Sequence, residues 1–200
     1  MLGPQHPSTL VTRANLARWS GEAGDPAGAR DQLAALLPAI QQALGAEHPN
    51  TLTAMAELAR FTGAAGDAAG ARDQLAALLP VEERILGPEH PGTLSARANL
   101  AALTGKAGDA AGARDQYAAL LPLRARILGP EHPETLFTRQ NLAWWTSEAG
   151  DAAGARDQYA ALLPVEERVL GPRHPGTLAA RTGLLLCTRK AAGNGQPATG

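Results

Sequence analysis

The sequence has few aromatic residues, one cysteine and no long apolar run, and each shortage excludes a class of protein. Aromatic residues make up 4% of the 200 residues, so a hydrophobic core has to be built mainly from leucine and alanine. The single cysteine, Cys187, allows no disulfide within the chain and no zinc knuckle. The longest apolar runs, such as residues 184–187, are far too short to span a bilayer, and no secretory signal follows Met1. These absences favour a cytoplasmic protein that does not enter a membrane.

The chain also lacks an excess of charge of either sign. It carries 18 basic and 19 acidic residues, which gives a formal net charge of −1. A general nucleic-acid binder or a protein bound to an anionic membrane surface needs a basic face, so both classes are disfavoured. The hydrophobic fraction of 44% is ordinary for a folded protein.

A unit of 42 residues fills nearly the whole chain. Successive copies align without a gap, and a leucine opens each of them: Leu2, Leu44, Leu86, Leu128 and Leu170. A fixed period of roughly 20–50 residues is typical of stacked repeat arrays. The sequence therefore predicts one elongated array over residues 2–190 and a disordered tail at 191–200. The predicted repeats are 2–43, 44–85, 86–127 and 128–169, followed by a half repeat at 170–190.

The spacing of apolar residues in the third copy predicts two helices. The first spans residues 93–106, with apolar positions recurring every three or four residues on one side, and His90 is placed to cap its start. Gly108 suits the position after this helix, where the backbone often takes the left-handed conformation. Asp109 suits the N-cap of a second helix at 110–127. Two antiparallel helices joined by this turn form a helical hairpin.

Two residues interrupt the pattern of the second helix. Pro122, which recurs as Pro38, Pro80 and Pro164, removes one backbone hydrogen bond. It predicts a kink after which the helix resumes, or a break into two short helices. Gly112 and its equivalents lie in the first turn of the second helix in every full copy, where a glycine lowers helix stability. Its recurrence suggests a close approach to the backbone of the first helix.

These residues resemble the tetratricopeptide repeat, in the 42-residue form found in kinesin light chains and in bacterial, notably actinobacterial, repeat arrays. The matching residues are Asn99-Leu100-Ala101 in the first helix, Gly108-Asp109 at the turn, Ala113 and Tyr117 in the second helix, and the connector 86–91. Arg97 and Thr104 depart from the tryptophan and tyrosine that the family often has there. One residue of each copy is placed to fill the space left by these smaller contacts: Trp19, Phe61, Leu103, Trp145 and Cys187.

The resemblance implies an all-α, right-handed superhelical solenoid of antiparallel helical hairpins, with four full repeats and a half repeat. In such arrays the first helix of each repeat lines a concave groove that binds peptides or extended protein segments, and the second helix forms the convex back. It therefore implies a non-catalytic protein-interaction scaffold. The alternative is a C-terminal regulatory sensor arm of a multidomain P-loop (NB-ARC-like) ATPase in signal transduction, with the ATPase domain upstream in a longer chain.

Comparison of the copies with one another locates candidate partner-binding residues. Positions that vary between copies concentrate on one face of the first helix, which in the family points into the groove. This face predicts a basic end and an aromatic end, which suit an acidic peptide with an aromatic anchor. The alternative is that the arginines are solvated and the tryptophan packs on a neighbouring helix. Three asparagines could bond a ligand backbone or bridge helices. The candidates are Asn15, Arg18, Arg60, Asn99, Lys106, Phe137, Gln140, Asn141 and Trp144.

The sequence predicts no catalytic, metal or cofactor site. One histidine recurs in every connector: His6, His48, His90, His132 and His174. Equivalent points in stacked repeats should lie about 8–10 Å apart, too far to share one ion, so capping of the first helix is the predicted role. The segment 104–107 partly matches a phosphate-loop motif, but the first glycine and the final hydroxyl residue of that motif are missing.

Paired acids recur on the second helix without the partners that acid–base chemistry needs. They are Glu82, Glu83, Glu166 and Glu167, and copy three has Arg124 and Ala125 in their place. We interpret them as solvated charges near a helical N-terminus.

The two ends of the array carry separate expectations. The first copy begins directly after Met1, which predicts either a longer protein or a frayed first hairpin. The half repeat is expected to cover the last hairpin with Leu178, Leu184 and Leu185, and to leave three basic residues in water: Arg181, Arg189 and Lys190. No motif identifies the partner, the pathway or the oligomeric state.

Overall fold

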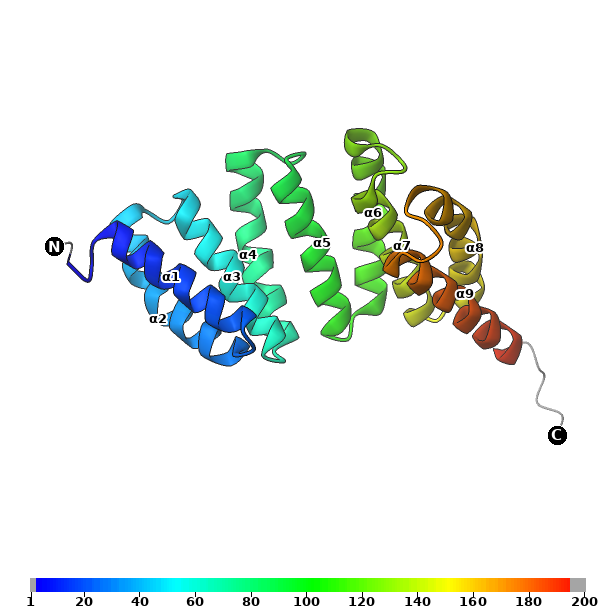
Figure 1. Ribbon diagram of the computed structural model, residues 1–200, viewed down its shortest axis with the longest axis horizontal. Helices are drawn as coiled ribbons and strands as arrows, with labels where there is room; N and C mark the ends of the chain where they lie inside the picture. Colours follow the sequence, from blue (N-terminus) through cyan, green and yellow to red (C-terminus); the bar gives the residue numbers. More distant parts are fainter. Residues whose placement is uncertain (1–2, 195–200) are drawn as a thin grey trace. The chain divides into compact units, whose positions relative to one another are not determined.

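The computed structural model describes residues 3–194, and this part of the chain folds into nine helices without a strand. The helices are α1 (Pro7–Glu22), α2 (Pro26–Leu44), α3 (Pro49–Ala64), α4 (Ala68–Leu86), α5 (Pro91–Lys106), α6 (Ala110–Leu128), α7 (Pro133–Glu148), α8 (Ala152–Val169) and α9 (Pro175–Asn194). Within each unit, helices consecutive in sequence pack side by side, as α1 does with α2 and α7 with α8 (Figure 1). The prediction of an all-α repeat of helical hairpins is confirmed.

The chain divides into two compact units after Leu103, a point inside α5. The first unit holds α1 to α4 and most of α5. The second holds the end of α5 and α6 to α9. In both units a second helix packs on its own first helix and on the first helix of the next copy.

Every first helix begins at a histidine, as predicted. The Nδ1 atom of each connector histidine accepts a hydrogen bond from the backbone N–H two residues later, at 3.1–3.2 Å. The proline that follows the histidine occupies the first helical position, where its missing N–H leaves no bond unmade. The five histidines are therefore used as helix caps.

The turn between the two helices of a hairpin follows the predicted glycine–aspartate chemistry. Gly108 takes the left-handed conformation with φ of 104°, and Asp109 caps α6 by accepting a hydrogen bond from the backbone N–H of Gly112 at 2.7 Å. A Cβ on Gly112 would collide with the Asp109 carboxylate, and no atom of the first helix lies among its nearest neighbours. The glycine therefore makes room for the cap, and its predicted close approach to the first helix stays a prediction.

The recurrent proline does not break the second helix. Pro38, Pro80, Pro122 and Pro164 each lie inside a helix that continues past them to residues 44, 86, 128 and 169. Of the two alternatives open from the sequence, the two short helices are excluded. The carbonyl that loses its helical partner belongs to an exposed alanine four residues earlier, such as Ala118, where water can bond it.

Adjacent copies fit together where a large side chain lies over a glycine of the preceding first helix. The ring of Phe61 occupies the space that a Cβ on Gly21 would need, and the ring of Trp145 does the same at Gly105. Leu103 approaches Gly63 in the same way, at 3.0 Å from the position of a Cβ. Phe61, Leu103 and Trp145 thus fill space between copies as expected, whereas the expectation is wrong for Trp19, which is 58% exposed.

Helix α9 covers the last hairpin with fewer leucines than expected. Leu184 packs on the cluster of Tyr159 and Cys187, whereas Leu178 is 46% exposed and Leu185 is 59% exposed. The basic residues expected in water include two that form ion pairs, Arg181 with Glu167 at 2.6 Å and Lys190 with Glu148 at 3.1 Å.

The helix also continues beyond the predicted end of the array. Residues 191–194 belong to α9, so the expectation of a disordered tail from residue 191 is wrong for these four positions. Residues 195–200 of the expected tail lie outside the described part of the chain.

Candidate functional site

The second unit contains an apolar pocket between α7 and α9. Phe137 and Trp144 stand one above the other on α7, and their side chains are 52% and 44% exposed. Leu186 on α9, 45% exposed, lines the same cavity of about 510 Å³. None of the residues that line this cavity is charged. Two large aromatic side chains therefore remain partly open to solvent beside an uncharged cavity.

The floor of this pocket depends on a glycine and a tyrosine. Gly183 of α9 stands where Asn15, Asn99 and Asn141 stand in other copies, and a Cβ at this position would meet the Tyr159 ring at 2.5 Å. Burial raises the pKa of the Tyr159 phenol, so the hydroxyl keeps its proton and donates to the Gln140 carbonyl oxygen at 3.4 Å. The pocket floor is therefore an aromatic ring, fixed at its polar end.

The polar candidates of α7 are already bonded within the unit. Gln140 donates from Nε2 to the Gly176 carbonyl oxygen at 3.1 Å and ties α7 to the first turn of α9. Asn141 donates from Nδ2 to the Phe137 carbonyl oxygen of its own helix at 2.9 Å. Asn141 thus bridges no neighbouring helix through this bond, and it is one of the residues that line the pocket.

In the first unit, α1 and α3 line a smaller cavity of about 160 Å³. Asn15 and Arg18 of α1 face Glu57 of α3 across it. The Arg18 guanidinium lies 4.8 Å from the centre of the Trp19 ring, and its Nε atom, shielded from solvent, has no hydrogen-bond partner among the described residues. Among the described residues, Arg18 therefore forms no ion pair, and it contacts the Trp19 ring.

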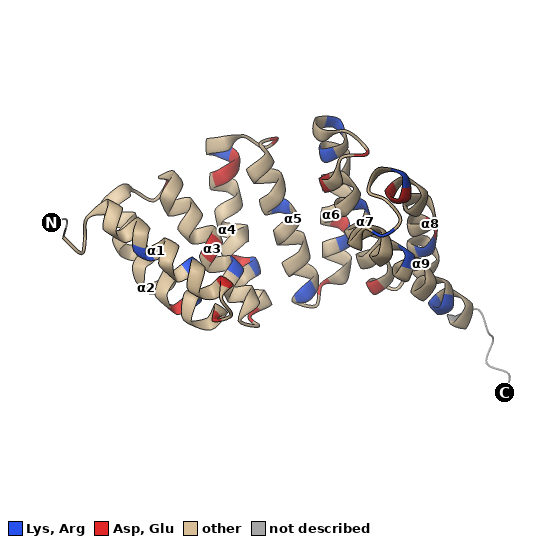
Figure 2. Cartoon of the chain, in the orientation of Figure 1, with Lys and Arg blue, Asp and Glu red and all other residues tan. Residues whose placement is uncertain are grey.

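Arg60 is less available than the sequence suggests. Its guanidinium bonds Glu57 at 2.5 Å, lies 3.6 Å from Glu22 and stacks 4.0 Å over the Phe61 ring. Two carboxylates of the chain itself thus balance the predicted basic end at this position. Figure 2 shows acidic and basic residues interspersed along the helices of each unit.

Two further candidates lie apart from these cavities. Asn99 is exposed on α5, and Lys106 is exposed in the last turn of the same helix. The structure places neither among the residues that line the cavity of its own unit. Sequence reasoning also missed the contributions of Tyr159, Gly183 and Leu186 to the apolar pocket. The loss of the asparagine at Gly183 is the signal that could have found them.

Some second helices carry a buried charged side chain at their junction with the next copy. Glu166 is 1% exposed and Arg124 is 2% exposed, while Glu82 is half-buried. Burial raises the pKa of the Glu82 and Glu166 carboxyls, although the charge of Arg139 opposes this at Glu166. The interpretation of these acids as solvated is wrong for Glu166, because the following first helix covers this position of α8.

The neighbouring acids pair with the next copy instead of remaining in water. Glu83 accepts from Arg97 at 2.8 Å, and Glu167 accepts from Arg181 at 2.6 Å. At the junction of the first and second copies both partners are replaced together, by Gln41 and Met55. The acids therefore belong to the junctions between copies.

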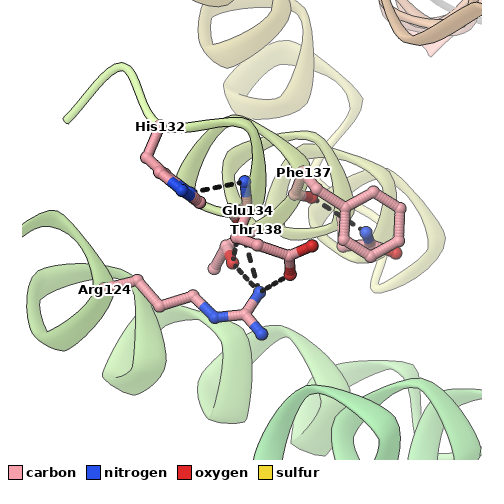
Figure 3. A network of polar contacts seen from close by, with 6 residues as sticks. Arg124, His132, Glu134, Phe137 and Thr138 are labelled. Atoms are coloured by element: carbon pink, nitrogen blue, oxygen red, sulfur yellow. Dashed lines mark hydrogen bonds and ion pairs between the residues drawn. The ribbon is translucent and has the colours of Figure 1, made fainter. Parts of the chain in front are cut away.

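Arg124 has a network of its own at the junction of α6 and α7 (Figure 3). One guanidinium nitrogen donates to the Thr138 hydroxyl at 2.8 Å and to the Glu134 carbonyl oxygen at 3.1 Å. The Glu134 carboxylate completes an ion pair at 3.3 Å. These contacts pair the Nη1 atom of a buried cation with groups of the following first helix, so the network joins α6 to α7.

Comparison with known families matches three stretches of the chain to tetratricopeptide repeats. They are residues 9–50, 51–92 and 99–165. The chain belongs to the tetratricopeptide repeat family. Each family hairpin here consists of a first helix, capped by histidine, and a second helix, capped by aspartate. No curated protein sequence matches the chain.

Solved structures of tetratricopeptide repeat proteins share this fold. A protein from Podosopora anserina, described as a kinesin light chain with nearly identical TPR-like repeats, is similar with a TM-score of 0.79 at 26% identity, over 94% of this chain and 89% of that chain. A variant structure of the same repeats gives a TM-score of 0.80 at 24% identity, over 96% and 90%. BtubC (BKLC) from P. vanneervenii has a TM-score of 0.67 at 16% identity, over 97% and 84%. The chain is thus a kinesin-light-chain-like repeat protein in its fold.

None of the helices in residues 3–194 has the length and apolarity needed to cross a membrane.

Proposed function

We propose that this tetratricopeptide repeat protein is a non-catalytic scaffold that binds an extended peptide segment of a protein partner. The binding residues are on the first helices, and the anchor point is the apolar pocket of the second unit. One observation carries this proposal: Phe137 and Trp144 remain half exposed beside an uncharged cavity of about 510 Å³ whose floor is the Tyr159 ring. An apolar side chain of a peptide would cover these rings and bury them from water.

The chemistry of the pocket defines the anchor. Its lining offers aromatic and aliphatic surface and no fixed charge, so a large apolar side chain fits better than an acidic one. Asn141, one of the lining residues, has an amide oxygen of the kind that accepts a hydrogen bond from a peptide backbone. The acidic character predicted for the peptide would rest on Arg18 and Lys106, since Arg60 already binds Glu57 and Glu22.

A peptide display library screened against the full chain tests the proposal. Peptides that bind should share a large apolar residue. They should lose at least about 30-fold in affinity to the Trp144→Ala variant, the change that corresponds to a hot-spot loss of about 2 kcal/mol. Trp19→Ala is the matched control for peptides without an acidic residue, because Trp19 is 58% exposed in the other unit, and the affinity of these peptides should stay unchanged.

Two results would contradict the proposal. Peptides that bind the Trp144→Ala and native chains equally would remove the pocket as the anchor site. Peptides without a common apolar residue would remove the apolar anchor. A separate comparison with Arg18→Glu and Lys106→Glu tests the acidic part, which fails if affinity for acidic peptides does not change. The cytoplasmic location and the sensor-arm alternative remain predictions from the sequence.

A further inference from the structure

A buried carboxyl group lies beneath helix α9. Glu166 on α8 is 1% exposed, and its Oε2 atom, shielded from solvent, has no hydrogen-bond partner among the described residues. Helix α9 packs on α8, and its Ala180 is equivalent to Ala54 and Thr138, which meet this position in other copies. Ala180 is fully buried and has no polar side-chain group to offer. An acid is therefore enclosed between two helices with no bond at Oε2.

The other copies show which residues suit this position. Ile40 packs with Ala54 of the following first helix. Arg124 donates to the hydroxyl of Thr138. The position thus takes an apolar residue opposite an alanine, or a cation opposite a hydroxyl. Glu166 combines an acid with an alanine, a contact that a protonated carboxyl tolerates better than an ionised one, because an unpaired charge is costly to remove from water.

Two titratable groups outside α9 act on Glu166. Arg139 of α7 favours the ionised carboxylate, but burial outweighs this effect and raises the pKa of Glu166. Tyr159, one helical face away on α8, interacts with the same carboxyl group, and its own raised pKa keeps the phenol neutral. Neither group therefore removes the preference of the buried carboxyl for its proton.

The titratable and charged side chains of α9 make other contacts. His174 caps the helix through Nδ1, and Cys187 packs in the cluster that contains Tyr159. Basic residues of α9 bind other acids of the unit, in the ion pairs Arg181–Glu167 and Lys190–Glu148. The part of α9 that covers Glu166 thus supplies it with no bonded cation.

Helix α9 also forms one wall of the apolar pocket. Gln140 of α7 donates to the Gly176 carbonyl oxygen at 3.1 Å and ties this wall to the opposite one. Four residues of α9 line the cavity: Ala179, Thr182, Gly183 and Leu186. The pocket is therefore complete only while α9 is docked on α8 and α7.

We propose that Glu166 is a pH-sensitive contact that controls the docking of α9. With the carboxyl group protonated, α9 lies closed over Glu166 and completes the pocket. When the group ionises, its charge favours exposure to water, and α9 opens locally. The consequence for ligands rests on the proposed peptide binding, since a peptide anchored in the pocket would favour the closed form.

The direction of the pH effect follows from burial. The closed form raises the pKa of the Glu166 carboxyl above its value in the open form, so the closed form holds the proton more tightly. The stabilisation of the closed form is complete below the pKa of the open form. It is lost as pH rises through the raised pKa of the closed form. Opening of α9 should therefore increase with pH.

Hydrogen exchange of the full chain, corrected for the intrinsic exchange rate at each pH, measures this opening. Between pH 5 and pH 8, opening of α9 should increase at least about fivefold more than opening of α7, because only α9 has to leave the buried charge. Glu166→Gln should abolish the increase. Glu82→Gln is the matched control, because Glu82 is the equivalent residue of α4 in the other unit, and it should leave the increase at α9 unchanged.

A second variant covers the case in which a buried amide holds α9 no better than an acid does. Glu166→Ile introduces the residue of the first copy, where Ile40 is 1% exposed and packs with Ala54. In this variant α9 should stay closed across the pH range. The proposal is overturned if opening of α9 rises with pH equally in the native and Glu166→Ile chains, or if α7 opens as much as α9.

A peptide whose binding depends on Trp144 tests the link to the pocket. At about ten times its Kd, the peptide should slow the opening of α9 at pH 8 about tenfold, because it binds only the closed form. Opening of α9 that is unaffected by the bound peptide would overturn this link. If no peptide depends on Trp144, the proposed function fails instead. Exchange of α9 in the native and Glu166→Ile chains then still decides whether Glu166 controls docking.

Discussion

The Asp109 carboxylate accepts a hydrogen bond from the backbone N–H of Gly112 and occupies the space that a side chain on Gly112 would need. The same pair recurs in each full copy, at Asp25 and Gly28 for example. The glycine is therefore required by the cap, and the usual rule for glycine in helices should fail here.

Gly112→Ala should destabilise the chain. Alanine in place of a helical glycine commonly stabilises by roughly 0.5–1 kcal/mol, but here the methyl group displaces the capping carboxylate, whose loss costs about 0.5–2 kcal/mol. The urea midpoint should fall. Gly193→Ala is a suitable control, because a Cβ at Gly193 meets nothing within 4 Å, and its midpoint should stay the same or rise. A rise with Gly112→Ala would contradict the capping argument.

Glu166→Gln should stabilise the chain at neutral pH. The folded state raises the pKa of this buried carboxyl above its unfolded value, so the folded protein holds the proton more tightly. Stability from this group is complete below the unfolded pKa and is lost as pH rises through the raised folded pKa. The native chain should therefore lose more stability than Glu166→Gln between pH 4 and 7, as urea titrations at several pH values can show. An equal change of unfolding free energy with pH in both proteins would refute the prediction.

Thr138→Val should cost about 1–3 kcal/mol of unfolding free energy. The substitution keeps the shape of the side chain but removes the hydroxyl that accepts a hydrogen bond from buried Arg124. Thr12, the equivalent residue of the first copy, bonds only the Ser8 carbonyl oxygen at an exposed site, so Thr12→Val should have a much smaller effect. A comparable loss at the two positions would mean that the Arg124 contact contributes little.

The adjacent tryptophans of α7 should respond in opposite ways. Trp145 packs over Gly105, and Trp145→Ala should remove about 3 kcal/mol or more of stability through lost packing. Trp144 is 44% exposed in the apolar pocket, and Trp144→Ala should change stability by less than about 1 kcal/mol. Thermal unfolding of the two variants measures the difference. Equal losses would assign Trp144 to the core instead of the pocket.

Local chemistry explains why the hairpins were predictable. The start of each first helix depends on a histidine and a proline that are neighbours in sequence, and the turn depends on Gly108 and Asp109. These signals recur every 42 residues, so a helix boundary predicted wrongly in one copy can be corrected by comparison with the other copies. Continuation of the second helix through Pro122 needed one more fact, namely that the affected carbonyl lies on the exposed side.

Contacts between copies explain what was not predictable. The burial of Glu166 depends on how α9 packs on α8, and the pairing of Arg60 depends on Glu22 from the preceding first helix. The apolar pocket likewise needs Tyr159 of α8 and Gly183 of α9 beside the predicted Phe137 and Trp144. A pattern within a single copy carries none of these relationships. It identified the face of the first helix but not the residues that complete its surface.

One position near the end of the second helix differs between adjacent copies, since it is Ile40, Glu82, Arg124 and Glu166 in turn. Ile40 packs with Ala54 in one junction, and Arg124 bonds Thr138 in another. A chain of similar hairpins is prone to dock a helix on the wrong neighbour while it folds. If α6 docked on the wrong first helix, Arg124 would meet Ala54 or Ala180 in place of Thr138, and a buried cation would lose its hydroxyl partner. The unlike residues at adjacent junctions would therefore act as specificity determinants, which favour docking of a second helix on its correct first helix.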